Sequence, residues 1–349
     1  MTTSGNLPIG MAGLQYPITQ VSLVVDTMDE LLERYYRMFG WAPWQDFDHI
    51  PPMHHNTMYM GRDVDYSLRG AEVYVGSLNF ELLMPLPGGE SLFHSHLKEH
   101  GNGIASIASM FHERVDGDAV KVAFKEEFGL DVINRAEIGE HIEYYYVDTQ
   151  EAFGCPIESG SGHAIDFAGP ARVYPDPSAE FGPSPDSGIE YRISQVTLVA
   201  TDLDTKVRNY HRAFGWAPWK FFSTNQPDFV RRSVMRGKDT DLALRVAQTQ
   251  VGDLIYEIVE PLGGSSPWQE FLDRNGEGLM GITVAPQAPA TAADAVAHFK
   301  SSGVEELLNV GVGEGAWHLL DTQAQFRTSI AVASRLAFDE VTPESSYPQ

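Results

Sequence analysis

The chain has 349 residues, 43% of them hydrophobic and 11% aromatic, which is typical of a globular protein long enough for two domains. Its formal charge of −24 would repel phosphate backbones and anionic lipids, so neither nucleic acid nor a membrane is an expected partner. The sequence has no run of about 20 apolar residues, no secretory signal and only one cysteine, and we therefore expect a cytoplasmic protein.

The first predicted strand begins at Gln20. Its apolar residues Val21, Leu23 and Val25 alternate with Gln20 and Ser22, so the two sets point to opposite faces. A helix is predicted next, because apolar residues recur at helical spacing and a glycine follows the last of them: Met28, Leu31, Leu32, Tyr35, Tyr36, Phe39 and Gly40. Short strand-like runs separated by Gly, Pro, Asn and Asp complete the unit.

The same order of elements occurs a second time before residue 160. The run GIASIASMF, after His100, predicts a new first strand, and residues 116–129 predict its helix. Ile142–Val147 and Pro156–Ser159 predict later strands. The first half of the chain therefore contains two strand–helix–strands modules.

The whole pattern then repeats at an offset of 173–176 residues. The segment FGWAPW begins at Phe39 and again at Phe214, and GNGIASI, from Gly101, matches GEGLMGI, from Gly276. Between the copies, residues 169–188 contain five prolines, which predict an extended linker outside the sheets. The chain is thus expected to hold four modules in two copies, with a boundary near residue 175.

A βαβββ module repeated four times, with LVV, helix and FGW in the first and third modules, resembles the vicinal oxygen chelate superfamily. This group includes glyoxalase I, methylmalonyl-CoA epimerase, extradiol dioxygenases and bleomycin-resistance proteins. The resemblance covers most of residues 16–335 and implies an α+β fold, in which four βαβββ modules pair into two glyoxalase-like half-barrel domains. The implied divisions are 1–170 for the first domain, 171–190 for the linker, 191–335 for the second domain and 336–349 for a C-terminal tail.

The resemblance also implies a divalent metal, held by side chains from the first and last strands of each module. In the first half, the matching positions are Gln20, Glu81, Ser106 and Glu158, where Ser106 replaces a histidine. We take Gln20, Glu81 and Glu158 as the implied metal ligands, and their oxygen atoms suit a hard or borderline ion. The identity of the ion stays open among Mg, Mn, Ni, Co, Zn and Fe. In the second half, two of the matching residues cannot bind a metal: the set is Gln195, Glu257, Gly281 and Ala331.

Glu81 is notable from the sequence alone, because it lies between Phe80 and Leu82. An ionised carboxylate in apolar surroundings is costly unless it is paired, hydrogen-bonded or bound to metal. A salt bridge from Glu81 to an arginine is the structural alternative, and for Gln20 it is an amide that faces solvent or bonds to the backbone. The second half offers fewer candidate groups, so the first half is the expected active site.

Three residues are hypothetical substrate contacts. Ser106 could meet the substrate or be merely a small strand residue, and Trp44 could form an aromatic wall or pack in the core. Tyr145 is one of three consecutive tyrosines on a predicted strand, and one of these phenols could line the site. The histidines of FHSHLKEH, from Phe93, could also place an imidazole near the site, with a solvated segment as the alternative.

Three functions remain open from the sequence. The first is a metal-dependent isomerase, epimerase or lyase that acts beside the carbonyl of a small, cyclic or aromatic molecule, with Glu81 or Glu158 moving the proton. The second is a metal-free binding protein of the bleomycin-resistance type. The third is an extradiol-type ring-cleaving dioxygenase, which requires two histidines and one carboxylate around iron. A homodimer is left open as well.

Overall fold

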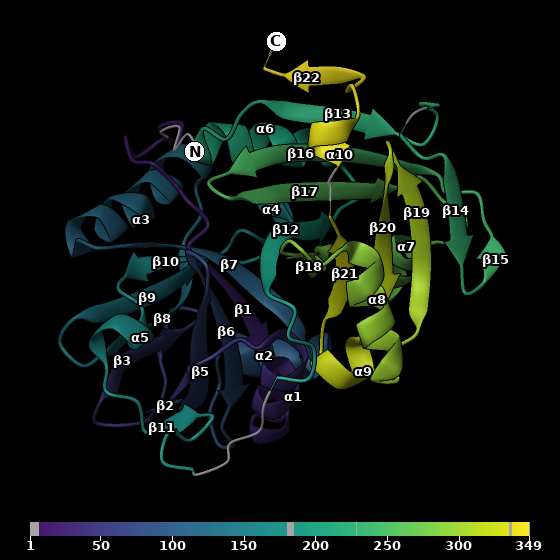
Figure 1. Cartoon of the computed structure of the whole chain (residues 1–349). Coiled ribbons are helices and arrows are strands. Elements are labelled where there is room, and N and C mark those ends of the chain that lie inside the picture. Colours follow the sequence, from purple (N-terminus) through teal and green to yellow (C-terminus); the bar gives the residue numbers. More distant parts are fainter. Residues whose placement is uncertain (1–6, 180–184, 228, 335–336, 349) are drawn as a thin grey trace.

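Two large curved sheets, one from each half of the chain, make up most of the molecule (Figure 1). The computed structural model describes residues 7–179, 185–227, 229–334 and 337–348. Each sheet has eleven strands, and the helices lie on the sheet faces and between the two halves. The predicted α+β architecture with two half-barrels is confirmed. Within the described residues, no helix combines the length and the apolar character needed to cross a membrane.

The first sheet is formed by two modules that meet at their first strands. Its strands, in the order in which they lie side by side, are β11 (Arg172–Tyr174), β2 (Trp44–His49), β5 (Leu68–Val75), β6 (Leu78–Pro85), β1 (Gln20–Val24), β7 (Gly103–Phe111), β10 (Ile157–Ser161), β9 (Ile142–Val147), β8 (Val132–Ile138), β3 (His54–Tyr59) and β4 (Arg62–Asp63). Strand β1 runs parallel to β6 and antiparallel to β7, and β7 runs parallel to β10. The four strands predicted to carry the site are therefore neighbours at the centre of the sheet.

The second sheet repeats this arrangement. Its order is β15 (Lys238–Asp239), β14 (Arg232–Met235), β19 (Glu306–Val312), β20 (Gly315–Leu320), β21 (Ser329–Ala333), β18 (Gly278–Pro286), β12 (Tyr191–Val199), β17 (Leu254–Pro261), β16 (Leu244–Val251), β13 (Trp219–Ser223) and β22 (Ser345–Tyr347). Strand β12 runs parallel to β17 and antiparallel to β18, as β1 does with β6 and β7.

The helices bury apolar faces against the sheets and against each other. They are α1 (Asp29–Phe39), α2 (Leu92–Glu99), α3 (Arg114–Phe128), α4 (Gln150–Phe153), α5 (Ala164–Phe167), α6 (Leu203–Phe214), α7 (Pro267–Asn275), α8 (Ala292–Ser301), α9 (Gln323–Phe326) and α10 (Ala337–Glu340). The predicted stripe on α1 is buried, and the helix ends where Gly40 adopts a positive φ of 70°. Helix α1 contacts α9 of the other half, and α4 contacts α6 (Figure 1).

One hydrophobic core runs through both halves, because it includes buried side chains from α1 and α3 as well as from α6 and α8. Two equivalent tryptophans connect the halves. Trp41 Nε1 donates a hydrogen bond to the carbonyl of Tyr191 (3.3 Å), and Trp216 Nε1 donates to the carbonyl of Tyr16 (2.8 Å). Each half also has its own smaller cluster on the concave face of its sheet, which we call the first cup and the second cup.

The Pro-rich segment does not lie wholly outside the sheets, as its prolines had predicted. Residues 172–174 form β11, which pairs with β2 at the sheet edge and ends directly before Pro175. The C-terminal tail does the same, because β22 pairs with β13 and ends before Pro348. An edge position explains the difference, since proline is tolerated beside an outer strand although not within a central one.

Candidate functional site

The first cup gathers polar side chains from the central strands of the first sheet. Alternation along β1 sends Val21 and Leu23 into the shared core and leaves Gln20 and Ser22 on the concave face. Glu81 joins them from β6, opposite Ser22 in the strand register. The two leading residues of the predicted site therefore share one buried hollow, in which Gln20 is 4% and Glu81 is 7% exposed.

Glu81 is held by hydrogen bonds instead of by an arginine. Gln20 Nε2 and Ser22 Oγ both donate to Glu81 Oε2, each at 2.6 Å. His163 Nδ1–H donates to Gln20 Oε1 (2.6 Å), so the amide of Gln20 is fixed from both ends. Glu81 forms no salt bridge with an arginine in the described part of the chain, although the sequence left that alternative open.

Three carboxylates lie in the first cup. Glu158 comes from β10, and Glu72, which sequence reasoning did not select, lies opposite Glu81 on β5. Glu72 Oε2 accepts hydrogen bonds from Asn79 Nδ2 (2.6 Å) and from the backbone N–H of Ile165 (3.1 Å). Glu72 could have been found by the signal that marked Glu81, since it too is a carboxylate flanked by apolar residues in a strand.

The pKa values of these carboxylates all rise. Burial raises the pKa of Glu72 to about 7 and that of Glu158 to about 8. Burial and the neighbouring charges of Glu158 and Glu72 hold the pKa of Glu81 well above its ordinary value. Carboxyl groups with such pKa values can hold or release a proton near neutral pH, which is what general acid–base chemistry requires.

Several buried polar atoms beside these carboxylates make no hydrogen bond. They are Glu158 Oε2, Ser106 Oγ and the hydroxyl of Tyr146, which make no well-formed hydrogen bond although Tyr146 lies near enough to Glu158 and Ser106 to interact with both. Buried polar atoms are nearly always partnered in folded proteins, so three of them together favour a cup that receives a polar ligand, a metal or water. By contrast, the neighbouring hydroxyl of Tyr144 donates to His54 Nε2 (2.9 Å).

Two predicted substrate contacts are not in the cup. Tyr145 points to the opposite side of β9, where its hydroxyl donates to the carbonyl of Gly117 (2.7 Å), while Tyr144 and Tyr146 line the cup. Trp44 is fully buried in the shared core, beside Phe80. Both hypotheses are therefore wrong, because strand register turns these side chains away from the concave face.

Comparisons with known proteins find similar structures but no similar sequence. No protein-family model and no curated protein matches the sequence. Among solved structures, a triple mutant of 4-hydroxymandelate synthase from Streptomyces coelicolor is similar, with a TM-score of 0.59, 12% identity and coverage of 91% of this chain and 92% of that chain. The chain has the vicinal oxygen chelate fold.

Two further structures are similar at lower scores. A Mn(II)-bound glyoxalase from Novosphingobium aromaticivorans has a TM-score of 0.47 and 14% identity, and the match covers 95% of this chain and 86% of that one. A fusion of a xylose isomerase-like TIM barrel with 4-hydroxyphenylpyruvate dioxygenase has a TM-score of 0.49 and 14% identity, covering 93% of this chain and 50% of that one.

In this vicinal oxygen chelate fold, the donor chemistry of the first cup fits a divalent cation. Glu81 and Glu158 supply carboxylate oxygens, while the amide of Gln20 directs its nitrogen to Glu81 and its oxygen to His163. The side chains are not drawn together, however, because no three His, Cys, Asp or Glu groups of the described residues are close enough to hold an ion. The cavity is also small, at about 30 Å³, which is room for water alone.

The second cup differs in its polarity. Glu257 accepts hydrogen bonds from Gln195 Nε2 (2.9 Å), Thr197 Oγ1 (2.9 Å) and Gln248 Nε2 (2.6 Å). Gln248 occupies the position that Glu72 has in the first cup, since Gln248 lies opposite Glu257 as Glu72 lies opposite Glu81. Apolar side chains line the remainder, and Ala331 replaces Glu158. Glu257 is the single carboxylate among the described residues that line this cup, and its hydrogen bonds occupy both oxygens, so the second cup has no pair of acidic groups.

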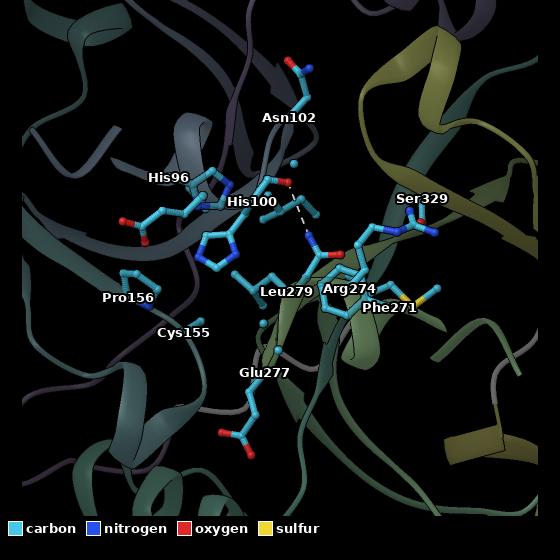
Figure 2. Close-up of a pocket in the computed structure, with 18 of the residues that line it drawn as sticks. His96, His100, Asn102, Cys155, Pro156, Phe271, Arg274, Glu277, Leu279 and Ser329 are labelled. Atoms are coloured by element: carbon cyan, nitrogen blue, oxygen red, sulfur yellow. Dashed lines mark hydrogen bonds between the residues drawn. The ribbon is translucent and has the colours of Figure 1, made fainter. Parts of the chain in front are cut away.

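A larger cavity of about 550 Å³ lies between the halves, and we call it the central cleft (Figure 2). Helices α2 and α7, together with the beginnings of β7 and β18, form its walls. None of its lining residues lines the small hollow that contains Gln20, Glu81 and Glu158. Its volume is in the range of small-molecule sites.

Proposed function

We propose that the first cup is the active site of a metal-dependent enzyme that moves a proton at a carbon beside a carbonyl group. The reaction is an isomerisation, an epimerisation or an elimination on a small, cyclic or aromatic molecule. The observation that carries this proposal is the group of buried carboxylates Glu72, Glu81 and Glu158, which have raised pKa values and no lysine or arginine partner among the described residues.

Gln20, Glu81 and Glu158 are the residues that would hold the divalent metal in this proposal. When bound, such an ion polarises a carbonyl oxygen and stabilises negative charge that develops on it. The hydrogen bonds of Ser22 and Gln20 keep Glu81 in one orientation, and His163 keeps the amide of Gln20 in place. Preorganised groups of this kind lower the cost of ordering the site around a substrate.

Glu158 is the better candidate to move the proton. Its Oε2 atom makes no well-formed hydrogen bond and lies near the Tyr146 hydroxyl, whereas Glu81 accepts from two donors. To take a proton from the carbon beside the carbonyl, Glu158 must be ionised, and burial, which raises its pKa to about 8 in the metal-free protein, makes its carboxylate a stronger base than an exposed one. The unbonded hydroxyl of Tyr146, which lines the same cup, would donate to a substrate oxygen. The cup side chains must move apart to admit a ring, because the cavity has room only for water.

The dioxygenase alternative shares the fold but is less well supported by the side chains. Its iron requires two imidazoles and one carboxylate. His49 and His163 both line the first cup, yet no such triad is assembled among the residues that the structure describes. His163 is already engaged through Nδ1 with Gln20.

A titration with Mn²⁺ tests the proposal. We expect one ion per chain, and at least tenfold weaker binding in Glu81→Ala and in Glu158→Ala. Glu257→Ala in the second cup is the matched control and should bind Mn²⁺ as the wild type does. The metal-loaded wild type should also exchange deuterium from solvent into a panel of cyclic and aryl ketones, as detected by mass spectrometry, while Glu158→Gln should lose this exchange.

Two results would count against the proposal. If the folded wild type binds no divalent ion, or if Glu81→Ala and Glu158→Ala bind it normally, the first cup is not a metal site, and the metal-free binding protein becomes the better interpretation. Oxygen uptake with a catechol by the iron-loaded protein would favour the dioxygenase instead.

A further inference from the structure

Two histidines in the central cleft make a separate pair. His96 and His100 are one helical turn apart, at the C-terminal end of α2 (Figure 2). Their ring centroids are 5.3 Å apart, and their planes are tilted by 50°. Side chains four residues apart share one face of a helix, and histidines at this spacing are a common way of chelating a metal.

The ring of each histidine lacks a polar partner. His96 Nε2 is buried and makes no hydrogen bond. The ring of His100 makes none either within the described residues, since its hydrogen bonds are those of its backbone, including the one that its carbonyl accepts from Asn275 Nδ2 (3.3 Å). A third histidine of the helix, His94, is different, because Ser91 Oγ and the carbonyl of Leu86 occupy both of its ring nitrogens.

The spacing of the two rings matches a shared ion. A metal lies about 2.0–2.1 Å from a coordinating imidazole nitrogen and therefore about 3.2 Å from the ring centroid. Two such rings at a tetrahedral angle place their centroids about 5.2 Å apart. The observed separation of 5.3 Å is close to this value, and rotation of the two rings about their side-chain bonds would turn one nitrogen of each towards the ion.

The charges around the central cleft favour a cation. Five carboxylates line it against two guanidinium groups; Glu270 is paired with Arg236 (2.7 Å) and Glu277 with Lys206 (2.7 Å), which leaves Glu99, Asp148 and Asp321 against Arg274. Helices α2 and α7 both point their C-terminal ends at the cleft, where Asn275 and His100 meet. The C-terminal end of a helix carries partial negative charge, so it attracts cations.

We propose that His96 and His100 bind a divalent transition metal such as Zn²⁺, Ni²⁺ or Cu²⁺. This site is distinct from the first cup and uses nitrogen donors instead of carboxylates. No third His, Cys, Asp or Glu is close enough among the described residues, so the remaining coordination positions face the central cleft and are open to water or a small molecule.

The duplication provides the variants for a test. At the equivalent positions of the second half, 175 residues later, the chain has Phe271 and Asn275. The substitutions His96→Phe and His100→Asn therefore introduce residues that the same fold already accepts at those places.

Cu²⁺ alone is titrated into the full-length protein and followed by electron paramagnetic resonance and calorimetry. We expect one Cu²⁺ per chain with nitrogen hyperfine structure, apart from any ion bound by oxygen donors in the first cup, and at least tenfold weaker binding of this nitrogen-coordinated ion in His96→Phe and in His100→Asn. His112→Ala, at an exposed histidine outside the cleft, and Glu81→Ala, in the first cup, are the controls and should retain this complex. Unchanged binding in both cleft variants, or an equal loss in His112→Ala, overturns the proposal.

Discussion

Glu72, Glu81 and Glu158 are buried together without a lysine or arginine to balance them in the described structure. A buried carboxylate of this kind is stable when it is protonated or bound to a cation, and it is costly when it is ionised and alone. The pKa values of these three carboxyl groups are raised because their ionised forms are unfavourable in this buried site. The free energy of folding of the metal-free protein should therefore depend on pH through these residues.

The direction of this dependence follows from the two states. The pKa of Glu158 is about 8 in the folded protein and near 4.5 when unfolded, so its contribution to stability is complete below pH 4.5 and is lost as the pH rises towards 8. The lowered pKa of His163, about 4, acts oppositely, with a contribution that is complete above pH 6.5 and lost as the pH falls towards 4. The two effects oppose each other between pH 4.5 and 6.5, and only the carboxylates act above that range.

We predict that the melting temperature of the metal-free protein falls by several degrees between pH 6.5 and 8.5. Glu158→Gln should reduce this fall, because its amide has no proton to lose, and saturating Mn²⁺ should reduce it in the wild type. Differential scanning fluorimetry measures all three. Glu257→Gln is the matched control, since the pKa of Glu257 is only about 6 and contributes little above that pH. An equally steep fall in Glu158→Gln would contradict the prediction.

The sequence allowed prediction of some cup residues and not of others. The alternation in β1 and β6 was clear, so Gln20 and Glu81 could be placed on one face. Among three consecutive tyrosines, alternation says only that the middle one differs from its neighbours, and choosing Tyr145 required a register that the sequence does not contain. His163 could not be predicted, because it follows β10 in an irregular segment whose path depends on the whole sheet.

At the scale of elements, the edge strand β11 is attached to β2 by side chains as well as by its backbone. Asp46 of β2 is buried and accepts hydrogen bonds from both Arg69 and Arg172. These ion pairs hold the pKa of Asp46 below its ordinary value, in spite of burial, which raises it. The prolines of this segment are visible in the sequence, whereas the partner of Arg172 is Asp46, 126 residues away. The sequence therefore predicts a linker where the structure has β11.

We predict that Asp46→Asn destabilises the protein by about 2 kcal/mol, which is less than for a fully buried ion pair because Arg172 is 45% exposed. Hydrogen–deuterium exchange of residues 171–174 should accelerate in this variant. Asp48→Asn is the control, because Asp48 also pairs with Arg172 but is 41% exposed, so its loss should cost under about 1 kcal/mol. Similar effects of both substitutions would show that the buried carboxylate has no special role in holding β11.

At the scale of the whole molecule, duplication has produced two halves whose largest hydrophobic core is shared. Tyr35 of the first half donates to the carbonyl of Phe326 in the second (2.9 Å). Each of the two equivalent tryptophans donates a hydrogen bond to a backbone carbonyl of the other half. The repeat in the sequence predicted that the two halves have the same architecture, which the structure confirms. It could not show that their helices pack against each other, because an apolar helix stripe has the same pattern whichever half covers it.

A shared core leads to a prediction about the isolated halves. Residues 1–175 expressed alone would expose the apolar faces that α6, α8 and α9 cover in the intact chain. Large exposed apolar patches drive association between molecules. We expect this fragment to aggregate, or to form a homodimer in which a second copy takes the place of the other half, and we expect co-expression with residues 176–349 to restore a soluble pair. Size-exclusion chromatography with light scattering distinguishes these states, and near-ultraviolet circular dichroism reports packing of the buried tryptophans. A monomeric first half with a sharp thermal transition would contradict the shared core, since it would show that each half is stable without the other.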